Sequence, residues 1–168
     1  MTMSIFGERI RKEAVDSLIT SLDRLLPRSG FKQSDRGEWT RKAGWKIEEV
    51  DLRVDDMSRE GLQPAFRVAI PTLDISPVGD TYEYIAEEKL PRIIDPSVAA
   101  GTRIPIPSLG HQVDRFITQL SGDFERGLRW FDQFATPELF KANLAKFVRP
   151  GCPAYLNAEQ FLNSVSKR

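Results

Sequence analysis

Residues 30–54, "GFKQSDRGEWTRKAGWKIEEVDLRV", contain the clearest indication of the fold class. They hold three short runs typical of strands, separated by the turn signals "SDRGE" and "KAGW". Links this short join antiparallel neighbours, because parallel strands need a crossover of a dozen or more residues. The stretch therefore predicts an antiparallel meander, and "PAFRVAIP" at residues 64–71 adds a further strand to it.

The third of these runs has an irregular apolar pattern. From Val50 to Val54, apolar residues alternate with charged ones, which is the period of a half-buried strand. Trp45 and Ile47 have the opposite parity. Because one extra residue reverses the parity of a strand, we expect a bulge near Glu48-Glu49 that restores a single apolar face.

Segments with helical periodicity precede and follow the strands. Apolar residues recur at three- and four-residue steps over residues 10–26 and again over residues 113–131. Gly127 lies on the second apolar face, where a missing side chain permits a close approach. Thr136 is expected to cap a further helix that begins at Pro137, and a last short helix is expected to open at residue 157.

The junction "RWFDQFATPELF", residues 129–140, is the most aromatic part of the chain. On a helical wheel Phe131 lies at the centre of the apolar stripe and Trp130 at its margin. Phe131 is therefore expected in the core. Trp130 is the side chain of this stretch that we assign to a partner contact, removable with little loss of stability.

The connection from the strands to the later helices, residues 71–110, is rich in proline and has little regular pattern. Within it "DTYEYIAEEKL" suits a short helix or an irregular loop, and "RIPIP" suits a short extended segment. Strands and helices are segregated along the chain, which is the pattern of α+β proteins. We expect one domain, 1–168: an antiparallel sheet of about four or five strands, with an N-terminal helix and C-terminal helices packed on one face.

Composition narrows the function classes. The chain has 168 residues, and Lys plus Arg equals Asp plus Glu at 24 each. General nucleic-acid binders carry a basic surplus, so no nucleic-acid partner is expected. A single cysteine precludes an internal disulfide and favours a reducing, cytoplasmic compartment. No stretch reaches membrane length, so no membrane partner is expected, and the oligomeric state stays open.

Motifs for catalysis are missing from the sequence. His111 is the single histidine and Cys152 the single cysteine, and neither has the flanking residues of a catalytic or metal-binding motif. There is no Gly-rich phosphate loop, dinucleotide fingerprint or Gly-x-Ser-x-Gly elbow. The sequence therefore assigns no catalytic residue, no metal ligand and no cofactor.

Acidic residues concentrate in the middle of the chain. Residues 47–100 carry five bases and twelve acids, whereas the segments on either side have positive surpluses. We assign Glu49, Asp51, Asp55 and Asp56, together with Trp130, to a partner-binding site. A negative surface speeds encounter with a basic partner. Acids that alternate with apolar residues are also ordinary on the wet face of a strand, so the assignment competes with simple solvation.

Several segments resemble domain-of-unknown-function family 4304. "LLPRSGFKQSDRGEWTRKAGWKIEEVDLRV", residues 25–54, is similar to the family's leucine-rich helix end, Gly-Phe-Lys, Trp-x-Arg and following strand, and "FRVAI" to its next strand. "GLRWFDQFATPELF", residues 127–140, resembles its C-terminal segment, in which an aromatic pair precedes a Thr-Pro-Glu helix start. The resemblance implies a small, mainly bacterial α+β protein without assigned activity, and no site residue follows from it.

Together these observations favour a non-enzymatic protein-binding module, for example an immunity-like protein that blocks a basic toxin or effector. One alternative is a small enzyme or divalent-ion-binding protein that uses the strand carboxylates. A second alternative is a small-molecule sensor with a pocket between the sheet and the helices.

Overall fold

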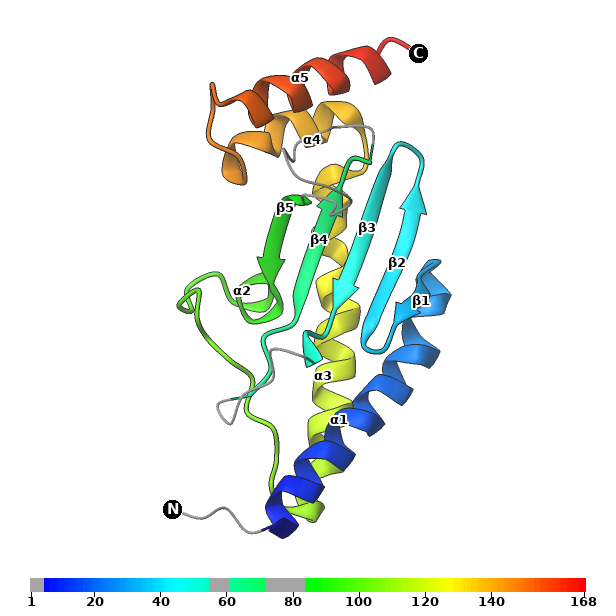
Figure 1. Ribbon diagram of the computed structural model, residues 1–168, viewed down its shortest axis with the longest axis vertical. Coiled ribbons are helices and arrows are strands. Elements are labelled where there is room, and N and C mark those ends of the chain that lie inside the picture. The colour runs from blue at the N-terminus through cyan, green and yellow to red at the C-terminus, as the bar shows by residue number, and fades with distance from the viewer. Residues whose placement is uncertain (1–4, 55–60, 72–83) are drawn as a thin grey trace.

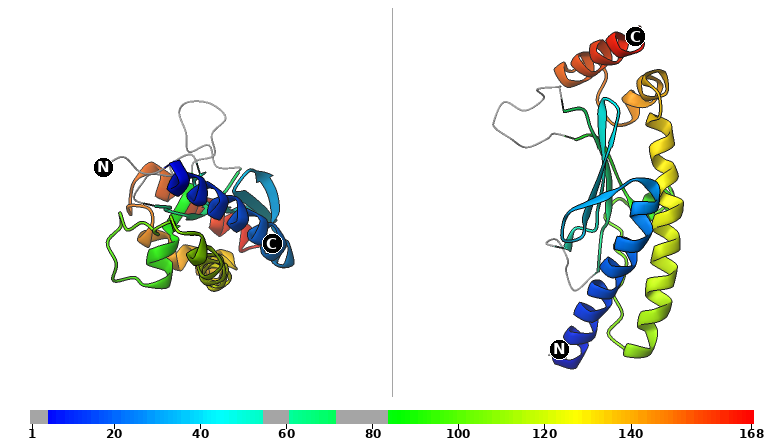
Figure 2. Two further views of the ribbon diagram at one scale, coloured as in Figure 1. Left: turned by 90° about the horizontal axis from the view of Figure 1, so that it is seen from below. Right: turned by 90° about the vertical axis from the view of Figure 1, so that its right-hand side faces the viewer.

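The computed structural model describes residues 5–54, 61–71 and 84–168 and has the predicted α+β architecture (Figure 1). The strands are β1 (Lys32–Asp35), β2 (Glu38–Ala43), β3 (Lys46–Asp51), β4 (Ala65–Ala69) and β5 (Tyr84–Lys89). The α-helices are α1 (Ile5–Leu25), α2 (Leu90–Ile94), α3 (Val113–Gly127), α4 (Pro137–Asn143) and α5 (Pro153–Val165). The 3-10 segment η4 (Leu128–Phe134) continues α3. In two further views, α1 and α3 lie on the same face of the sheet, and α4 and α5 lie at one end of it (Figure 2).

The sheet is an antiparallel meander in the order β1-β2-β3-β4-β5, and its first four strands follow the predicted order. β3 pairs without interruption: Glu48 stands opposite Arg41 of β2 and Val68 of β4. The predicted bulge near Glu48-Glu49 is therefore wrong. β3 also ends earlier than its alternating pattern suggested, at Asp51, and Arg53 follows with a φ of 55° that leaves the extended region.

The segment "DTYEYIAEEKL" was expected to be a short helix or a loop, but its described residues form strand β5, apart from Leu90, which begins α2. β5 pairs with the free edge of β4, and this pairing buries Ile85 and Ala86. Long-range pairing thus decides the conformation of a segment whose local pattern is ambiguous. The extended segment expected at "RIPIP" is confirmed, because Ile104 exchanges two backbone hydrogen bonds with Leu62, at 2.7 and 2.9 Å.

The helices end and begin partly as expected. The Leu139 amide donates to Thr136 Oγ1 at 3.2 Å, which confirms Thr136 as the cap of α4. α5 starts at Pro153, earlier than the expected residue 157, because the Cys152 thiol acts as its cap and accepts from the Tyr155 amide at 3.4 Å. None of the helices in the described ranges combines the length and apolar character needed to cross a membrane.

The core lies between the sheet and the α1–α3 layer. Phe66 of β4 contacts Phe124 and Phe131, with ring centroids 5.8 and 5.6 Å apart. Trp39 of β2 is fully buried, and its indole N–H donates to Asp23 of α1 at 2.8 Å. Helix α1 is therefore fixed to the sheet by apolar burial and by the one polar atom of the buried indole side chain.

Candidate functional site

The two sheet faces carry very different side chains. Alternation along β3 sends Val50 and Glu48 toward the helices and Glu49 and Asp51 to the opposite face. Glu49 and Asp51 therefore do share a face, as the sequence predicted. Asp55 and Asp56, assigned to the same site, lie outside the described residues.

Arg67 of β4 neutralises the acids on this outer face. Its Nη1 donates to Glu49 Oε1 and to Asp51 Oδ2, both at 2.8 Å, and its Nε donates to Glu87 Oε2 at 2.5 Å. Cross-strand pairing places Arg67 directly opposite Glu49 on one side and Glu87 on the other. Lys89 donates to the second oxygen of Glu87. The acids are thus bound within the protein, and this Arg67 network contains Glu49, Asp51, Arg67, Tyr84, Glu87 and Lys89.

Tyr84 completes the network. Its hydroxyl donates to Glu49 Oε2 at 2.6 Å, and the Arg67 guanidinium lies over its ring, 4.7 Å from the centroid. Burial and this hydrogen bond to Glu49 raise the pKa of the Tyr84 hydroxyl. Burial also raises the pKa of Glu49, although the hydrogen bonds from Tyr84 and Arg67 oppose it. The network carries three carboxylates, Glu49, Asp51 and Glu87, against the two bases Arg67 and Lys89.

Glu48 is a buried charged residue of β3, and its burial explains why the strand needs no bulge although its apolar pattern is irregular. Its side chain is 2% exposed and faces the helices, where it accepts hydrogen bonds from Arg41 and Lys46. Arg41 also donates to the Ser29 carbonyl at 2.6 Å and lies over the Phe31 ring. A buried carboxylate is tolerated when charged donors satisfy both of its oxygens, so β3 keeps its register without a bulge.

Trp130 lies on the other side of the sheet from Glu49. It is half-buried, and its ring makes edge contacts with Phe131, Phe134 and Phe147 at centroid distances of 5.3, 4.9 and 5.8 Å. The structure therefore brings Glu49 and Asp51 together but does not bring Trp130 to them. Its aromatic contacts make Trp130 part of the packing at the end of α3.

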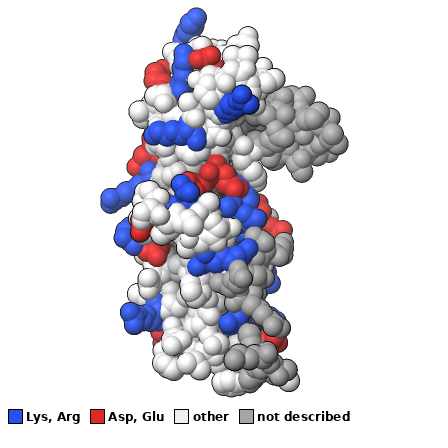
Figure 3. Space-filling view, turned by 90° about the vertical axis from the view of Figure 1, so that its left-hand side faces the viewer, with Lys and Arg blue, Asp and Glu red and all other residues white. Residues whose placement is uncertain are grey.

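On the side of the molecule that carries α2, the acidic side chains of the described residues do not form a broad negative patch. There, positive and negative side chains alternate across the described surface (Figure 3). This interspersion agrees with the Arg67 network, in which each carboxylate has a cationic partner. Steering of a basic partner needs a field of one sign, which this arrangement weakens.

A cleft of about 590 Å³ lies between α3, the 102–108 segment and the start of α2. We call it the α3 cleft. Its apolar lining comes from all three elements and consists of Leu90, Pro91, Ile94, Ile104, Pro105, Ile106, Pro107, Phe116 and Leu120. Its polar side chains on α3 are Arg115, Gln119 and Asp123, and Gln112 lines it from the residue just before the helix. An apolar cleft with a few polar groups on one rim is the usual form of a small-molecule site.

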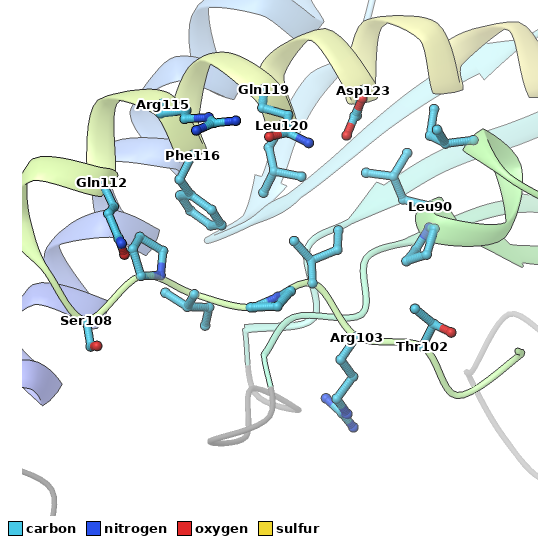
Figure 4. A pocket seen from close by; sticks show the side chains of 16 residues that line it. Leu90, Thr102, Arg103, Ser108, Gln112, Arg115, Phe116, Gln119, Leu120 and Asp123 are labelled. Atoms are coloured by element: carbon cyan, nitrogen blue, oxygen red, sulfur yellow. The ribbon is translucent and has the colours of Figure 1, made fainter. Parts of the chain in front are cut away.

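The polar residues of the α3 cleft follow one row of the helix. Figure 4 shows Arg115, Gln119 and Asp123 in sequence along α3, beside Phe116 and Leu120. Asp123 is paired with Arg126. Within residues 5–54, 61–71 and 84–168, no hydrogen bond or ion pair engages the Arg115 guanidinium. Arg115 is therefore a cation at the rim that is available to a ligand.

The basic residue on the opposite wall is turned away from the cleft. The Arg103 side chain points away from α3 (Figure 4), and its Nη1 donates to the Gly61 carbonyl at 3.2 Å. Sequence reasoning identified neither Arg115 nor Arg67 as a site residue. Both lie at ordinary polar positions of a helix and a strand, and no local signal indicates which distant segment packs beside them.

No family model, no curated protein and no solved structure matches this chain. The resemblance to family 4304 therefore rests on the residues quoted above.

Proposed function

We propose that this protein is a binding module whose ligand enters the α3 cleft. The observation that carries the proposal is the cleft itself, about 590 Å³ in volume, with an apolar lining and a rim cation that has no partner in the described chain. Pockets of this size bury most of the surface of a small organic ligand. Of the alternatives drawn from the sequence, the small-molecule sensor is the closest to this proposal.

The acidic site is the less favourable location for a ligand. Glu49 and Asp51 have side chains that are 7% and 19% exposed, and both are bound by Arg67. A basic toxin or effector would have to compete with Arg67 for these carboxylates. Their assignment, together with Asp55, Asp56 and Trp130, to recognition of a basic partner stays a prediction. The alternative of an enzyme or divalent-ion-binding protein that uses the strand carboxylates also stays a prediction. Among the described residues, no group of three or more His, Cys, Asp or Glu side chains is placed to hold a metal ion.

The test is a backbone-amide NMR titration with a library of small amphipathic molecules. Gln119→Trp is designed to fill the cleft, and Thr118→Trp, at the neighbouring exposed position on the same helix, is the matched control. Ligands are expected to shift resonances of residues 102–108 and 112–123 in the wild type and in Thr118→Trp, and not in Gln119→Trp. Shifts confined to the outer sheet face, or shifts that survive in Gln119→Trp, would contradict the proposal.

A further inference from the structure

The α3 cleft restricts the chemistry of its ligand. We infer that it takes an alkyl carboxylate, with the carboxylate bound at Arg115 and the aliphatic chain lying along Phe116 and Leu120 toward α2. This inference rests on the proposed function of the same cleft and adds the ligand class to it.

The charges of the cleft select an anionic head and set its direction. Arg115 is exposed and has no hydrogen-bond or ion-pair partner within the described residues. Asp123 lies two helical turns further along α3, about 12 Å away at 1.5 Å per residue, and is paired with Arg126. A carboxylate is attracted by the cation at the first position, whereas the second position holds an acid that is already paired and offers no cation. The ligand head is therefore placed at the Arg115 end of the cleft, with its chain directed toward Asp123 and α2.

The walls of the cleft select an aliphatic body. The wall that faces α3 contains Pro105 and Pro107, which have no backbone N–H, and Ile104, whose N–H and C=O are both used by Leu62. Leu90 and Leu120 are buried beside it. A ligand body with many polar groups would find few partners there and would lose its hydration. A hydrocarbon chain has no hydrogen bonds to water to lose on entering such a site, and it gains free energy from burial.

The experiment measures dissociation constants by calorimetry for hexanoate, octanoate, decanoate and the neutral decanamide, below the concentrations at which they aggregate. Each added methylene is expected to tighten binding about fourfold, from the usual gain per buried CH₂. Arg115→Gln is expected to weaken decanoate about tenfold, because a charge-assisted hydrogen bond is lost. Decanamide is expected to bind Arg115→Gln and the wild type equally.

Two variants serve as controls. Arg129→Gln removes an exposed arginine from η4, outside the cleft, and is expected to leave decanoate binding unchanged. Gln119→Trp is expected to abolish binding of both decanoate and decanamide. If decanoate and decanamide bind equally and Arg115→Gln changes neither, the carboxylate inference is overturned while the proposed binding function stands. If decanoate binds Gln119→Trp as tightly as the wild type, the cleft is not the site, and the proposed function loses its support as well. An absence of alkyl-carboxylate binding, with other ligands detected by the NMR titration, overturns the ligand class alone.

Discussion

Gly127 of α3 lies directly against the ring of Phe66 on β4. A Cβ atom at Gly127 would lie 2.9 Å from Phe66 Cζ and 3.0 Å from Leu90 Cδ1. Such distances are shorter than any normal packing contact, so the absence of a side chain lets α3 approach the sheet at this point. The close approach predicted for Gly127 is confirmed, and it fixes the position of the helix that carries Arg115.

We predict that Gly127→Ala destabilises the protein by about 1 kcal/mol. Overpacking costs about 1–3 kcal/mol and outweighs the gain of about 0.5–1 kcal/mol from replacing a helical glycine. Gly122 of the same helix is the matched control, because a Cβ there meets nothing within 4 Å. Gly122→Ala is expected to stabilise by about 0.5–1 kcal/mol. Urea denaturation of the two variants measures both changes in stability. If both variants were stabilised, or both destabilised, the close packing of Gly127 against Phe66 would not explain the effect.

Phe131 and Trp130 are neighbours in sequence with different degrees of burial. Phe131 is 2% exposed and contacts Phe31 and Phe66, so Phe131→Ala is expected to cost about 3–5 kcal/mol. Trp130 is half-buried with three aromatic edge contacts, so we expect Trp130→Ala to cost about 2 kcal/mol, more than its marginal place on the helical wheel suggested. Thermal and urea unfolding measure both losses. If Trp130→Ala lowered the free energy of unfolding by less than about 0.5 kcal/mol, Trp130 would not be part of the packed core.

The Arg67 network makes stability depend on pH through Glu49. Burial raises the pKa of Glu49 above its ordinary value of 4.5. The native state therefore favours protonated Glu49, and this contribution to stability is complete below the ordinary pKa and is lost as pH rises through the native pKa. Glu49→Gln imitates the protonated form. We expect this variant to lose less stability than the wild type between about pH 4.5 and neutrality, measured by urea unfolding at a series of pH values.

Glu87 of the same network supplies a control of opposite sign. Burial acts to raise the pKa of Glu87, but the hydrogen bonds from Lys89 and Arg67 outweigh it. The pKa of Glu87 is therefore lowered below its ordinary value of 4.5. Its contribution to stability is present above the ordinary pKa and is lost as pH falls through the native value. Glu87→Gln is expected to be less stable than the wild type at neutral pH, with the difference narrowing in acid. If the free energy of unfolding changed with pH in the same way in Glu49→Gln and Glu87→Gln, the opposite pKa shifts assigned to these two acids would be wrong.

Cys152 caps α5 with a thiol, which is a weak hydrogen-bond acceptor. Cys152→Ser supplies a hydroxyl at the same position and is expected to stabilise the protein by about 0.5–1 kcal/mol, whereas Cys152→Ala is expected to destabilise it by a similar amount. Thermal unfolding of both variants under reducing conditions tests the cap. Equal effects of Ser and Ala would mean that the thiol contributes nothing to the start of α5.

Much of the fold was predictable because it depends on neighbours in sequence. The apolar period of α1, the turns at Gly37 and Gly44, and the Thr136 cap each involve residues a few positions apart, and each appears in the structure. The start of α5 at Pro153 was missed because cysteine is not among the usual capping residues. The candidate site was less predictable: Glu49 and Asp51 were correctly placed on one face, but their neutralisation by Arg67 depends on the register between β3 and β4.

Periodicity and turn residues act locally, so the amino-acid pattern was enough to predict the class of the fold, the antiparallel order of the first four strands and the apolar faces of the helices. Three other features depend on contacts between residues that are distant in the sequence. β5 became a strand because the free edge of β4 was available to it. Glu48 can be buried because Arg41 and Lys46 form ion pairs with its carboxylate. The α3 cleft formed because the 102–108 segment pairs with Leu62 and so lies beside a helix that follows it in sequence. Each of these features depends on the free energy of contacts between distant residues, which a local pattern does not contain.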